Sequence, residues 1–340
     1  MINGLTLDEL EKIMQDIGEP RFRAKQLFDW LHQKLVSNYD QMANLPSTLR
    51  EKLKNTYPIN TLEIVERLES KSDGTKKYLF KLKDDNIIES VFMQYSHGPS
   101  VCISTQVGCR MGCKFCASTV GGLIRNLDPE EMLSQVYEMI KDNNSPVRNI
   151  VLMGSGEPFE NYDSVLKFID IINSPLGQNI GIRHITVSTC GLVPEILKFA
   201  DEQLGTTLAI SLHSANDEDR AKIMPIARKY SLANIMDAVQ VYIQKTNRRV
   251  TFEYGLIHEE NDSAGHAIEL CRLLKGINCH VNLIPINNVL ENNFQASKNV
   301  SEFFDILNKH HIQVTVRRKL GSDIDASCGQ LRRRYMSANN

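Results

Sequence analysis

The chain has 340 residues, of which 42% are hydrophobic, and its formal net charge at pH 7 is −2. This length allows one large core or two modest ones, and the near-neutral charge excludes a general attraction to polyanions, so nucleic acid could be held only by local basic patches. No apolar run reaches the length of a membrane span, and no signal peptide follows Met1, so we expect a cytoplasmic protein without membrane attachment.

Helical periodicity predicts a small helical module over residues 1–60. Thr6 and Glu9 form a capping box, and apolar residues then recur at helical spacing until Gly18 ends the run. Between residues 61 and 94 the pattern changes to strands, with turns at Asp73-Gly74 and over residues 84–86. We expect these strands to form an antiparallel extension that leads into the main domain.

Strand patterns alternate with helical patterns over residues 95–325, and residues 326–340 form a tail. Repeated strand–helix units indicate an α/β fold with a parallel sheet. Six units without a GxGxxG motif favour an incomplete (β/α)6 barrel over a doubly wound fold, and either fold collects its functional loops at the carboxyl ends of the strands. The predicted strands are Val101–Ser104, Ile150–Met153, His184–Ser188, Thr207–Ser211, Arg249–Tyr254 and His280–Ile284, followed by Gln313–Val316.

The cysteines point to metal or thiolate chemistry. Eight cysteines in a chain without a signal peptide argue against a disulfide framework. Cys109, Cys113 and Cys116 form a CX3CX2C pattern in the loop after the first strand of the barrel. Three thiolates on a four-iron cluster leave one iron open, whereas a structural zinc site needs four ligands. The alternative is therefore a zinc site completed by a distant Cys or His.

This cysteine loop resembles that of the radical S-adenosylmethionine (SAM) enzymes, in which SAM chelates the open iron and is cleaved to a 5′-deoxyadenosyl radical. Gly156-Glu157-Pro158, after the second strand, resembles the motif that meets the SAM amino group. The resemblance implies one [4Fe-4S] cluster with an exchangeable iron on the three cysteines. It also implies a SAM site, although each member alone would be an ordinary strand-end residue. Its members are Glu157, Pro158, Ser188, Ser211, Leu212, His213 and Asn287.

Further motifs resemble the RlmN and Cfr family of radical SAM RNA methyltransferases, in order and over nearly the whole chain. The residues after Cys116 look more like RlmN than Cfr. The resemblance implies methylation of C2 of an adenine in 23S rRNA and in tRNA, with two SAM per turnover, whereas a Cfr-like enzyme would modify C8. The matching segments are Val101–Cys109, Ile150–Gly154, Ile210–His213, Asn282–Pro285 and Asp323–Gln330.

The family chemistry assigns roles to three more residues. An adenine ring carbon is not nucleophilic, so ordinary displacement cannot methylate it and a radical route is needed. The resemblance implies that Cys328 accepts a methyl group from the first SAM and passes it to RNA as a methylene radical. It implies that Cys102 resolves the RNA–protein adduct through a transient disulfide with Cys328. Glu89 would accept the proton lost from the carbon, unless it is a strand carboxylate facing solvent.

Partners and alternatives follow from the same resemblance. It implies RNA substrates and a low-potential electron donor such as flavodoxin or ferredoxin, and we expect a monomer. A rival radical SAM reaction, methylthiolation, needs a second cysteine trio, but the other cysteines are scattered. Two departures from the family pattern are Cys190, where relatives commonly have Ser, and Ser155, where they have Met. Three basic patches are candidates for phosphate binding, and the alternative for each is an ordinary solvated face. They are Arg21–Lys25, Arg317–Lys319 and Arg332–Arg334.

Overall fold

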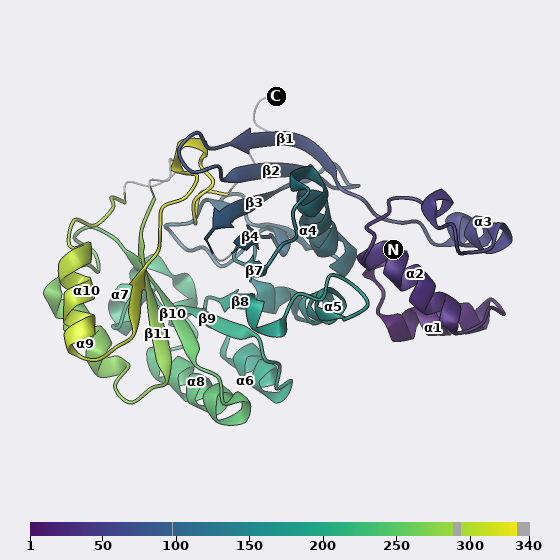
Figure 1. The fold of residues 1–340 in the computed structure, drawn as a ribbon. Coiled ribbons are helices and arrows are strands. Elements are labelled where there is room, and N and C mark those ends of the chain that lie inside the picture. Colours follow the sequence, from purple (N-terminus) through teal and green to yellow (C-terminus); the bar gives the residue numbers. More distant parts are fainter. Residues whose placement is uncertain (97, 288–293, 332–340) are drawn as a thin grey trace.

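The computed structural model describes residues 1–96, 98–287 and 294–331. Three helices at the start form a module at one side of the molecule (Figure 1): α1 (Leu7–Asp16), α2 (Phe22–His32) and α3 (Ser47–Thr56). The predicted capping box begins α1, because the Thr6 side chain accepts from the Glu9 N–H and the Glu9 carboxylate accepts from the Thr6 N–H. Helical structure in the first 60 residues is therefore as predicted.

One ten-stranded sheet runs through the rest of the described chain, in the order β1-β2-β3-β4-β7-β8-β9-β10-β11-β12. The strands from β4 to β12 pair in parallel, and the order does not return to its start, as expected for an incomplete barrel. The alternation predicted from the sequence is confirmed. The parallel strands are β4 (Gly98–Cys102), β7 (Asn149–Leu152), β8 (Ile185–Thr189), β9 (Thr207–Ser211), β10 (Val250–Leu256), β11 (Cys279–Pro285) and β12 (Val314–Val316).

The antiparallel extension belongs to the same sheet as the barrel. Its strands are β1 (Glu63–Glu69), β2 (Lys76–Lys81) and β3 (Ile87–Tyr95), and β3 pairs antiparallel with β4. The sheet is therefore continuous from the extension into the barrel. This continuity places the turn at Asp73-Gly74 and the strand that carries Glu89 beside the chemistry described below.

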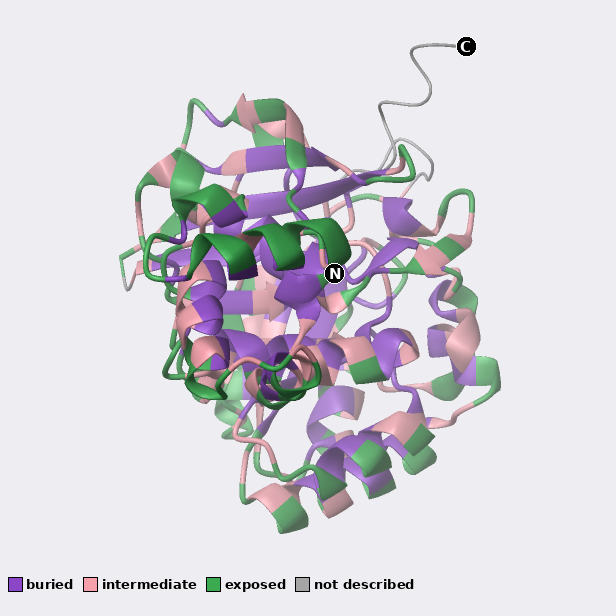
Figure 2. Cartoon of the chain, turned by 90° about the vertical axis from the view of Figure 1, so that its right-hand side faces the viewer, coloured by how far each residue is buried: buried purple, intermediate pink, exposed green. Residues whose placement is uncertain are grey.

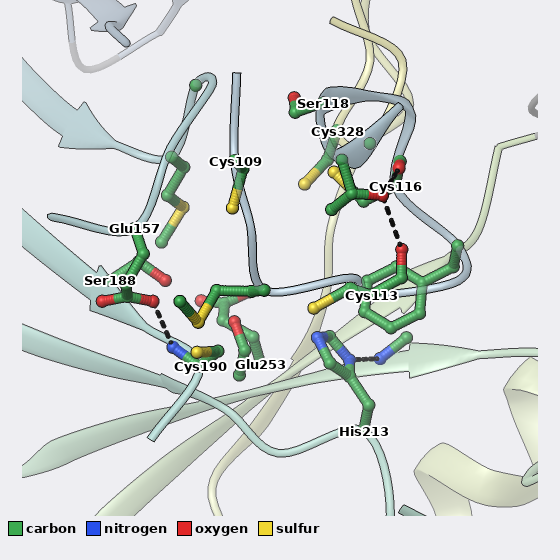
Figure 3. A pocket seen from close by; sticks show the side chains of 18 of the residues that line it. Cys109, Cys113, Cys116, Ser118, Glu157, Ser188, Cys190, His213, Glu253 and Cys328 are labelled. Carbon is green, nitrogen blue, oxygen red and sulfur yellow. Dashed lines mark hydrogen bonds between the residues drawn. The ribbon is translucent and has the colours of Figure 1, made fainter. Parts of the chain in front are cut away.

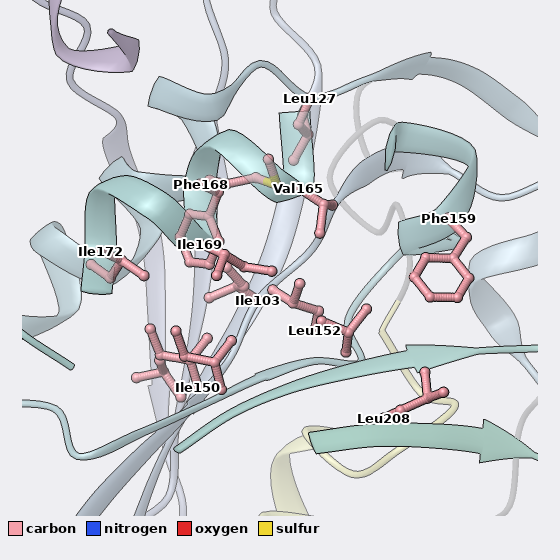
Figure 4. Packing of buried hydrophobic residues seen from close by; sticks show 14 of the residues in the cluster. Ile103, Leu127, Ile150, Leu152, Phe159, Val165, Phe168, Ile169, Ile172 and Leu208 are labelled. Atoms are coloured by element: carbon pink, nitrogen blue, oxygen red, sulfur yellow. The ribbon is translucent and has the colours of Figure 1, made fainter. Parts of the chain in front are cut away.

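Helices cover the parallel strands and bury an apolar core between the two layers. In α5, Val165, Phe168, Ile169 and Ile172 follow helical spacing and face Ile150 of the sheet (Figure 4). Fully burying a side chain of this kind contributes about 1.5–3 kcal/mol. The covering helices are α4 (Pro129–Asn143), α5 (Tyr162–Asn173), α6 (Val193–Asp201), α7 (Asp217–Ile223), α8 (Leu232–Thr246), α9 (Ala264–Leu273) and α10 (Val300–Lys309).

Specific polar contacts fasten the helical module to the barrel. The Met1 amino group lies 3.2 Å from a carboxylate oxygen of Glu130 in α4. The buried ring of His32 in α2 lies 2.8 Å, through Nδ1, from the hydroxyl of Tyr137 in α4. Figure 2 shows buried residues concentrated on the sheet and on the inner faces of the helices. None of the helices within the described residues is long and apolar enough to cross a membrane.

Candidate active site

The loops that follow the parallel strands converge on one cavity of about 1070 Å³, part of it open to solvent (Figure 3). Most of the site residues predicted from the sequence line it, although they come from the ends of five parallel strands and from the C-terminal segment. This convergence is what a parallel sheet predicts. The predicted residues that line the cavity are Cys109, Cys113, Cys116, Glu157, Pro158, Ser188, Ser211, His213, Asn287 and Cys328.

The cysteine loop is held in a hairpin formed by β5 (Gln106–Gly108) and β6 (Leu123–Asn126). Gly108 has a φ of +78°, and a Cβ there would lie 2.0 Å from the Gly122 carbonyl oxygen. Only glycine therefore fits where the two strands of this hairpin approach each other. The three cysteine side chains of the loop point into the same space, with Cys328 beside Cys116 (Figure 3). Burial, together with the neighbouring thiols and carboxylates, raises the pKa of Cys109 to about 12.

The spacing of these thiols distinguishes a cluster from a single ion. Among the residues that the structure describes, no three His, Cys, Asp or Glu side chains are placed to hold one metal ion together. A cubane cluster does not need them to be, because each thiolate binds a different iron. Three thiol side chains that point into one cavity fit a [4Fe-4S] cluster with one iron left open.

Glu157 is a buried carboxylate held by backbone amides. Its Oε2 accepts a hydrogen bond from the Cys190 N–H at 2.8 Å, and its Oε1 accepts one from the Phe159 N–H at 3.1 Å. Burial raises the pKa of Glu157, and these hydrogen bonds oppose that effect. Gly156, with a φ of +112°, allows the turn to lie against Gln106, where a Cβ would be 2.7 Å from that side chain. The arrangement suits the binding of an ammonium group.

A buried histidine and a buried arginine shape the opposite wall. Nδ1 of His213 accepts from the Gly255 N–H at 2.8 Å, and burial lowers the pKa of His213 to about 3, so the ring is neutral. Arg220 donates to the carbonyl oxygens of Cys190 at 2.7 Å and of Leu212 at 3.0 Å, and so ties together the loops after β8 and β9. Leu212 itself is fully buried and, unlike the other predicted SAM residues, does not line the cavity.

Cys328 lies between this cavity and a smaller one that it shares with Cys102. Cys328 is exposed, whereas Cys102 is buried at the end of β4, and burial raises the pKa of Cys102 to about 12. The C-terminal segment rests on the cysteine loop, because the Gly329 carbonyl accepts from the Ala117 N–H at 2.8 Å. The Asn287 side chain also donates to the Cys328 carbonyl at 3.4 Å. The structure thus brings both predicted thiols together.

Two charged residues line the cavity beyond those predicted for it: Glu253 was not singled out, and Arg317 was predicted only as part of a phosphate-binding patch. Glu253 in β10 is buried, which raises its pKa, and it accepts a hydrogen bond from Asn282 at 2.8 Å. Arg317 follows β12 and lines both cavities; burial lowers its pKa, but the thiols and Glu253 outweigh this and leave the pKa raised. An ionisable residue in the otherwise apolar strand Val250–Leu256 was the available signal for Glu253.

Glu89 does not face solvent, so that alternative reading is wrong. It is 2% exposed in β3, and its carboxylate lies 2.8 Å from the ammonium group of Lys77, which is 1% exposed. It lies outside the main cavity, in a small hollow that it shares with Ser118 and Leu331. Both of those residues also line the main cavity, so Glu89 is one layer of side chains away from it.

The predicted basic patches differ in their surroundings. Arg21 pairs with Glu11, and Arg23 donates to the Asn44 carbonyl, so part of the charge in the helical module is engaged. Arg318 and Lys319 are exposed and line the cavity shared by Cys102 and Cys328. The third patch, Arg332–Arg334, lies outside the described residues.

Comparisons with known proteins agree with this site. Residues 103–271 match the radical SAM superfamily, and residues 2–59 match the ribosomal RNA large subunit methyltransferase N-terminal domain. Two relatives are each named probable dual-specificity RNA methyltransferase RlmN. The one from Lachnoclostridium phytofermentans is 54% identical over 98% of this chain and 94% of its own length. The one from Clostridium novyi is 51% identical over 99% of both chains.

A solved structure is also similar over nearly the whole length. The crystal structure of a radical SAM methyltransferase from Sphaerobacter thermophilus has a TM-score of 0.93 and 43% identity, covering 97% of this chain and 98% of that one. Fold, cysteine loop and sequence agree over the same residues. The chain belongs to the RlmN family of radical SAM RNA methyltransferases.

Proposed function

We propose that this chain methylates C2 of an adenine in 23S rRNA and in tRNA, with Cys328 carrying the methyl group and two SAM consumed per turnover. The observation that carries the proposal is the position of Cys328, which faces the cavity of the cysteine loop on one side and the cavity of Cys102 on the other. In this position Cys328 can be methylated and can give up a hydrogen atom to a radical formed in the main cavity. Cys102 is then close enough to attack its sulfur and release the RNA.

As a radical SAM methyltransferase, the chain uses a [4Fe-4S] cluster and SAM, which together supply a 5′-deoxyadenosyl radical that can take a hydrogen atom from a methyl group. We assign the cluster to Cys109, Cys113 and Cys116. Glu157 would bind the ammonium group of SAM, since its carboxylate is buried and fixed by backbone amides. Around it, Pro158, Ser188, Ser211, His213 and Asn287 would contact the rest of SAM, with Leu212 supporting the loop from beneath.

Cys328 acts first as a nucleophile. Its thiol loses a proton to solvent and its sulfur attacks the methyl carbon of SAM, so that an S–CH3 bond forms as the bond from that carbon to the sulfonium sulfur breaks and S-adenosylhomocysteine leaves. The exposure of Cys328 permits this approach. Loss of one hydrogen atom to the 5′-deoxyadenosyl radical then leaves a methylene radical on Cys328, which bonds to the adenine carbon and joins RNA to protein. The ring of this adduct must give up one electron, which the oxidised cluster would accept, as well as one proton before it is aromatic again.

Cys102 releases the RNA. After losing its proton, its sulfur attacks the sulfur of Cys328; a disulfide forms as the bond from sulfur to the methylene carbon breaks, and that carbon takes a proton to become the methyl group. The disulfide must then be reduced by a dithiol before another turnover. Burial holds the Cys102 thiol protonated until that stage, since it raises the pKa to about 12.

Glu89 would accept the proton that leaves the substituted adenine carbon. Its support is the small hollow bordered by Ser118 and Leu331, since these two residues also line the main cavity and form the single layer that separates Glu89 from it. The Lys77 ammonium, 2.8 Å from the carboxylate, favours its charged, proton-accepting form against the cost of burial.

RNA would approach from the side of Cys328. Arg318 and Lys319 border the cavity of the two thiols, where they can contact phosphates while an unstacked base enters. Arg21, Arg23 and Lys25 of the helical module would contact RNA further away. We extend the proposal to a cytoplasmic monomer that receives electrons from a carrier such as flavodoxin or ferredoxin.

The product identifies the reaction directly. Unmodified 23S rRNA and tRNA are incubated anaerobically with enzyme, SAM and reductant, and their nucleosides are analysed by mass spectrometry. We expect 2-methyladenosine in both RNAs. Finding 8-methyladenosine would support the Cfr-like alternative, while neither product, from a protein that contains zinc in place of iron, would support an RNA-binding protein without this activity.

The two thiols are tested by substitution. We expect Cys328→Ala to give no methylated nucleoside and Cys102→Ala to accumulate RNA covalently bound to protein, seen as a retarded band on denaturing gels. Cys279→Ala, at the start of β11, is the matched control and should behave as wild type. Normal turnover with release of free RNA by the Cys102 variant would refute the resolving role.

A further inference from the structure

A shallow hollow lies on the outer side of the cysteine loop. It is lined by Arg110, Met111, Pro225, Ile226, Arg228 and Lys229, and we refer to it as the basic hollow. Met111 lines both this hollow and the main cavity, into which Cys109 and Cys113 point, so the hollow and the cluster position lie on either side of this residue. Because electron transfer slows steeply with distance, this is a short route from the surface to the cluster position.

The basic hollow is built on a fixed surface. The Lys114 N–H donates to the Ile223 carbonyl at 2.9 Å, which fastens the cysteine loop to the end of α7. Gly112 lies against Pro225, at 3.4 Å from where a Cβ would be, and the Arg110 guanidinium lies 2.6 Å from a carboxylate oxygen of Glu160. A partner would therefore meet a preformed face with little loss of conformational entropy.

The charge of the basic hollow selects an acidic partner. Three of its lining residues are cationic and none is acidic; Arg110 is paired with Glu160, so the charge offered to a partner is that of Arg228 and Lys229. Within the described residues, the exposed Arg228 guanidinium has neither an ion pair nor a hydrogen bond. Met111, Pro225 and Ile226 form an apolar floor between the charges. An apolar centre with a charged rim is typical of a transient, electrostatically steered complex.

RNA is a less suitable occupant of this face. The adenine must reach Cys328, whose segment rests on the Cys116 end of the loop through the hydrogen bond from the Ala117 N–H to the Gly329 carbonyl. The basic hollow lies at the other end of the loop, around Met111 and Gly112. A partner in the hollow would leave the Cys328 side free for RNA.

We propose that the basic hollow is the docking site of a small acidic flavodoxin, with the exposed edge of its flavin over Met111. The apolar floor suits the apolar edge of a flavin, and Arg228 and Lys229 pair with carboxylates around it. On docking, the flavin is oxidised by one electron and the cluster is reduced by one electron, with no bond formed or broken. This docking site rests on the proposed function, because a radical SAM reaction needs that electron.

The test is the double variant R228E/K229E, which changes two exposed residues outside the main cavity. Cluster reduction by photoreduced flavodoxin is followed by loss of the cluster's visible absorbance, and flavodoxin binding is followed by calorimetry. We expect reduction at low flavodoxin concentration to slow by about tenfold or more and binding to weaken similarly. Reduction and RNA methylation with dithionite, which needs no docking, should match wild type. The control R272E/K275E makes the same charge change at two exposed residues in the last turn of α9 and just beyond its end, and should have no effect.

Three results would contradict either the docking site or the proposed function on which it rests. Wild-type rates of reduction by flavodoxin in R228E/K229E would refute the docking site. Loss of RNA binding by this variant, together with loss of the dithionite-driven reaction, would assign the basic hollow to RNA and also refute it. Failure of wild type to methylate RNA with dithionite would refute the proposed function instead. The docking site would still be tested in that case, because flavodoxin binding and cluster reduction are measured without RNA.

Discussion

Glu89 and Lys77 are each almost fully buried, so each charge depends on the other. Replacing Glu89 with Gln keeps the shape and removes the capacity to accept a proton. We expect Glu89→Gln to bind iron and SAM as wild type does but to lower the methylation rate by about 100-fold, the scale of a lost general base. Single-turnover nucleoside analysis measures this. A variant with the wild-type rate would place the proton acceptor elsewhere.

Substitution of Lys77 measures how much the ion pair with Glu89 contributes to stability, apart from the role of Glu89 in catalysis. Lys77→Met would leave a buried carboxylate without its cation, which typically costs about 3–5 kcal/mol. We expect the free energy of unfolding to fall by that order in urea denaturation of the full chain. Lys81→Met, at an exposed ion pair on the same strand, is the control and should change it by less than about 1 kcal/mol.

Site residues could be predicted where the residues that act together are close to one another in the sequence. The cysteine loop and Glu157 stand in short motifs, and both line the cavity as expected. No short motif marks Glu253 or Arg317 as a cavity residue, and Arg317 was predicted only as part of a basic patch, because their common place in the cavity arises when β10 and the end of β12 lie on either side of β11. Leu212 shows the converse, because a residue within a matching motif can support the loop with its side chain turned away from the cavity.

At the scale of elements, the contact between α2 and α4 makes stability depend on pH. Burial lowers the pKa of His32 to about 3, whereas an unfolded histidine titrates near 6.5. Between these values the unfolded chain binds a proton at this site that the folded chain refuses, so stability falls as pH decreases from about 6.5 towards 3. The slope from one such group approaches about 1.4 kcal/mol per pH unit.

Substitution of His32 isolates that contribution. We expect His32→Gln, which can still hydrogen-bond the Tyr137 hydroxyl, to unfold with a shallower pH dependence between pH 6.5 and 5 than wild type. Urea denaturation at several pH values measures it. His310→Gln, on an exposed residue at the end of α10, should retain the wild-type slope. An unchanged slope in the His32 variant would show that this ring is protonated in the folded chain.

Periodicity predicted which segments form helices and which form strands, but it did not predict which strands pair with one another. Val165, Phe168 and Ile172 repeat with helical spacing, and the barrel strands are short apolar runs, so both could be identified from local pattern. The pairing of β3 with β4 depends on edge hydrogen bonds that no side-chain pattern records. The sequence therefore predicted an extension leading into the barrel without showing that the two share one sheet.

At the scale of the whole molecule, the extension and the cysteine loop jointly position Cys328. The Gly321 N–H donates to the Asp73 carboxylate at 2.9 Å, and the Lys71 N–H donates to the Asp323 carboxylate at 3.0 Å. On the other side, the Ser118 hydroxyl donates to the Leu331 carbonyl at 2.9 Å. The segment that carries Cys328 is thus fixed at both ends by parts of the chain far away in sequence.

Loosening one end should slow the reaction without touching the SAM site. We expect Asp73→Ala to lower the rate of Cys328 methylation by about five- to tenfold, since misplacement of a reacting group is costly, with SAM affinity unchanged. Peptide mass spectrometry of Cys328 over time measures the rate. Asp85→Ala, in the exposed turn between β2 and β3, is the control. Equal rates for Asp73→Ala and wild type would show that this end of the segment has no positioning role.

The hydrogen bond from the Ala117 N–H to the Gly329 carbonyl also has a kinetic consequence. It delivers the methyl acceptor to the cavity as part of the polypeptide, so its local concentration is set by geometry and not by the amount of protein in solution. Self-methylation should then be a first-order process whose half-time is unchanged by dilution. Within the catalytic cycle, diffusion limits only the molecules that arrive from outside the chain.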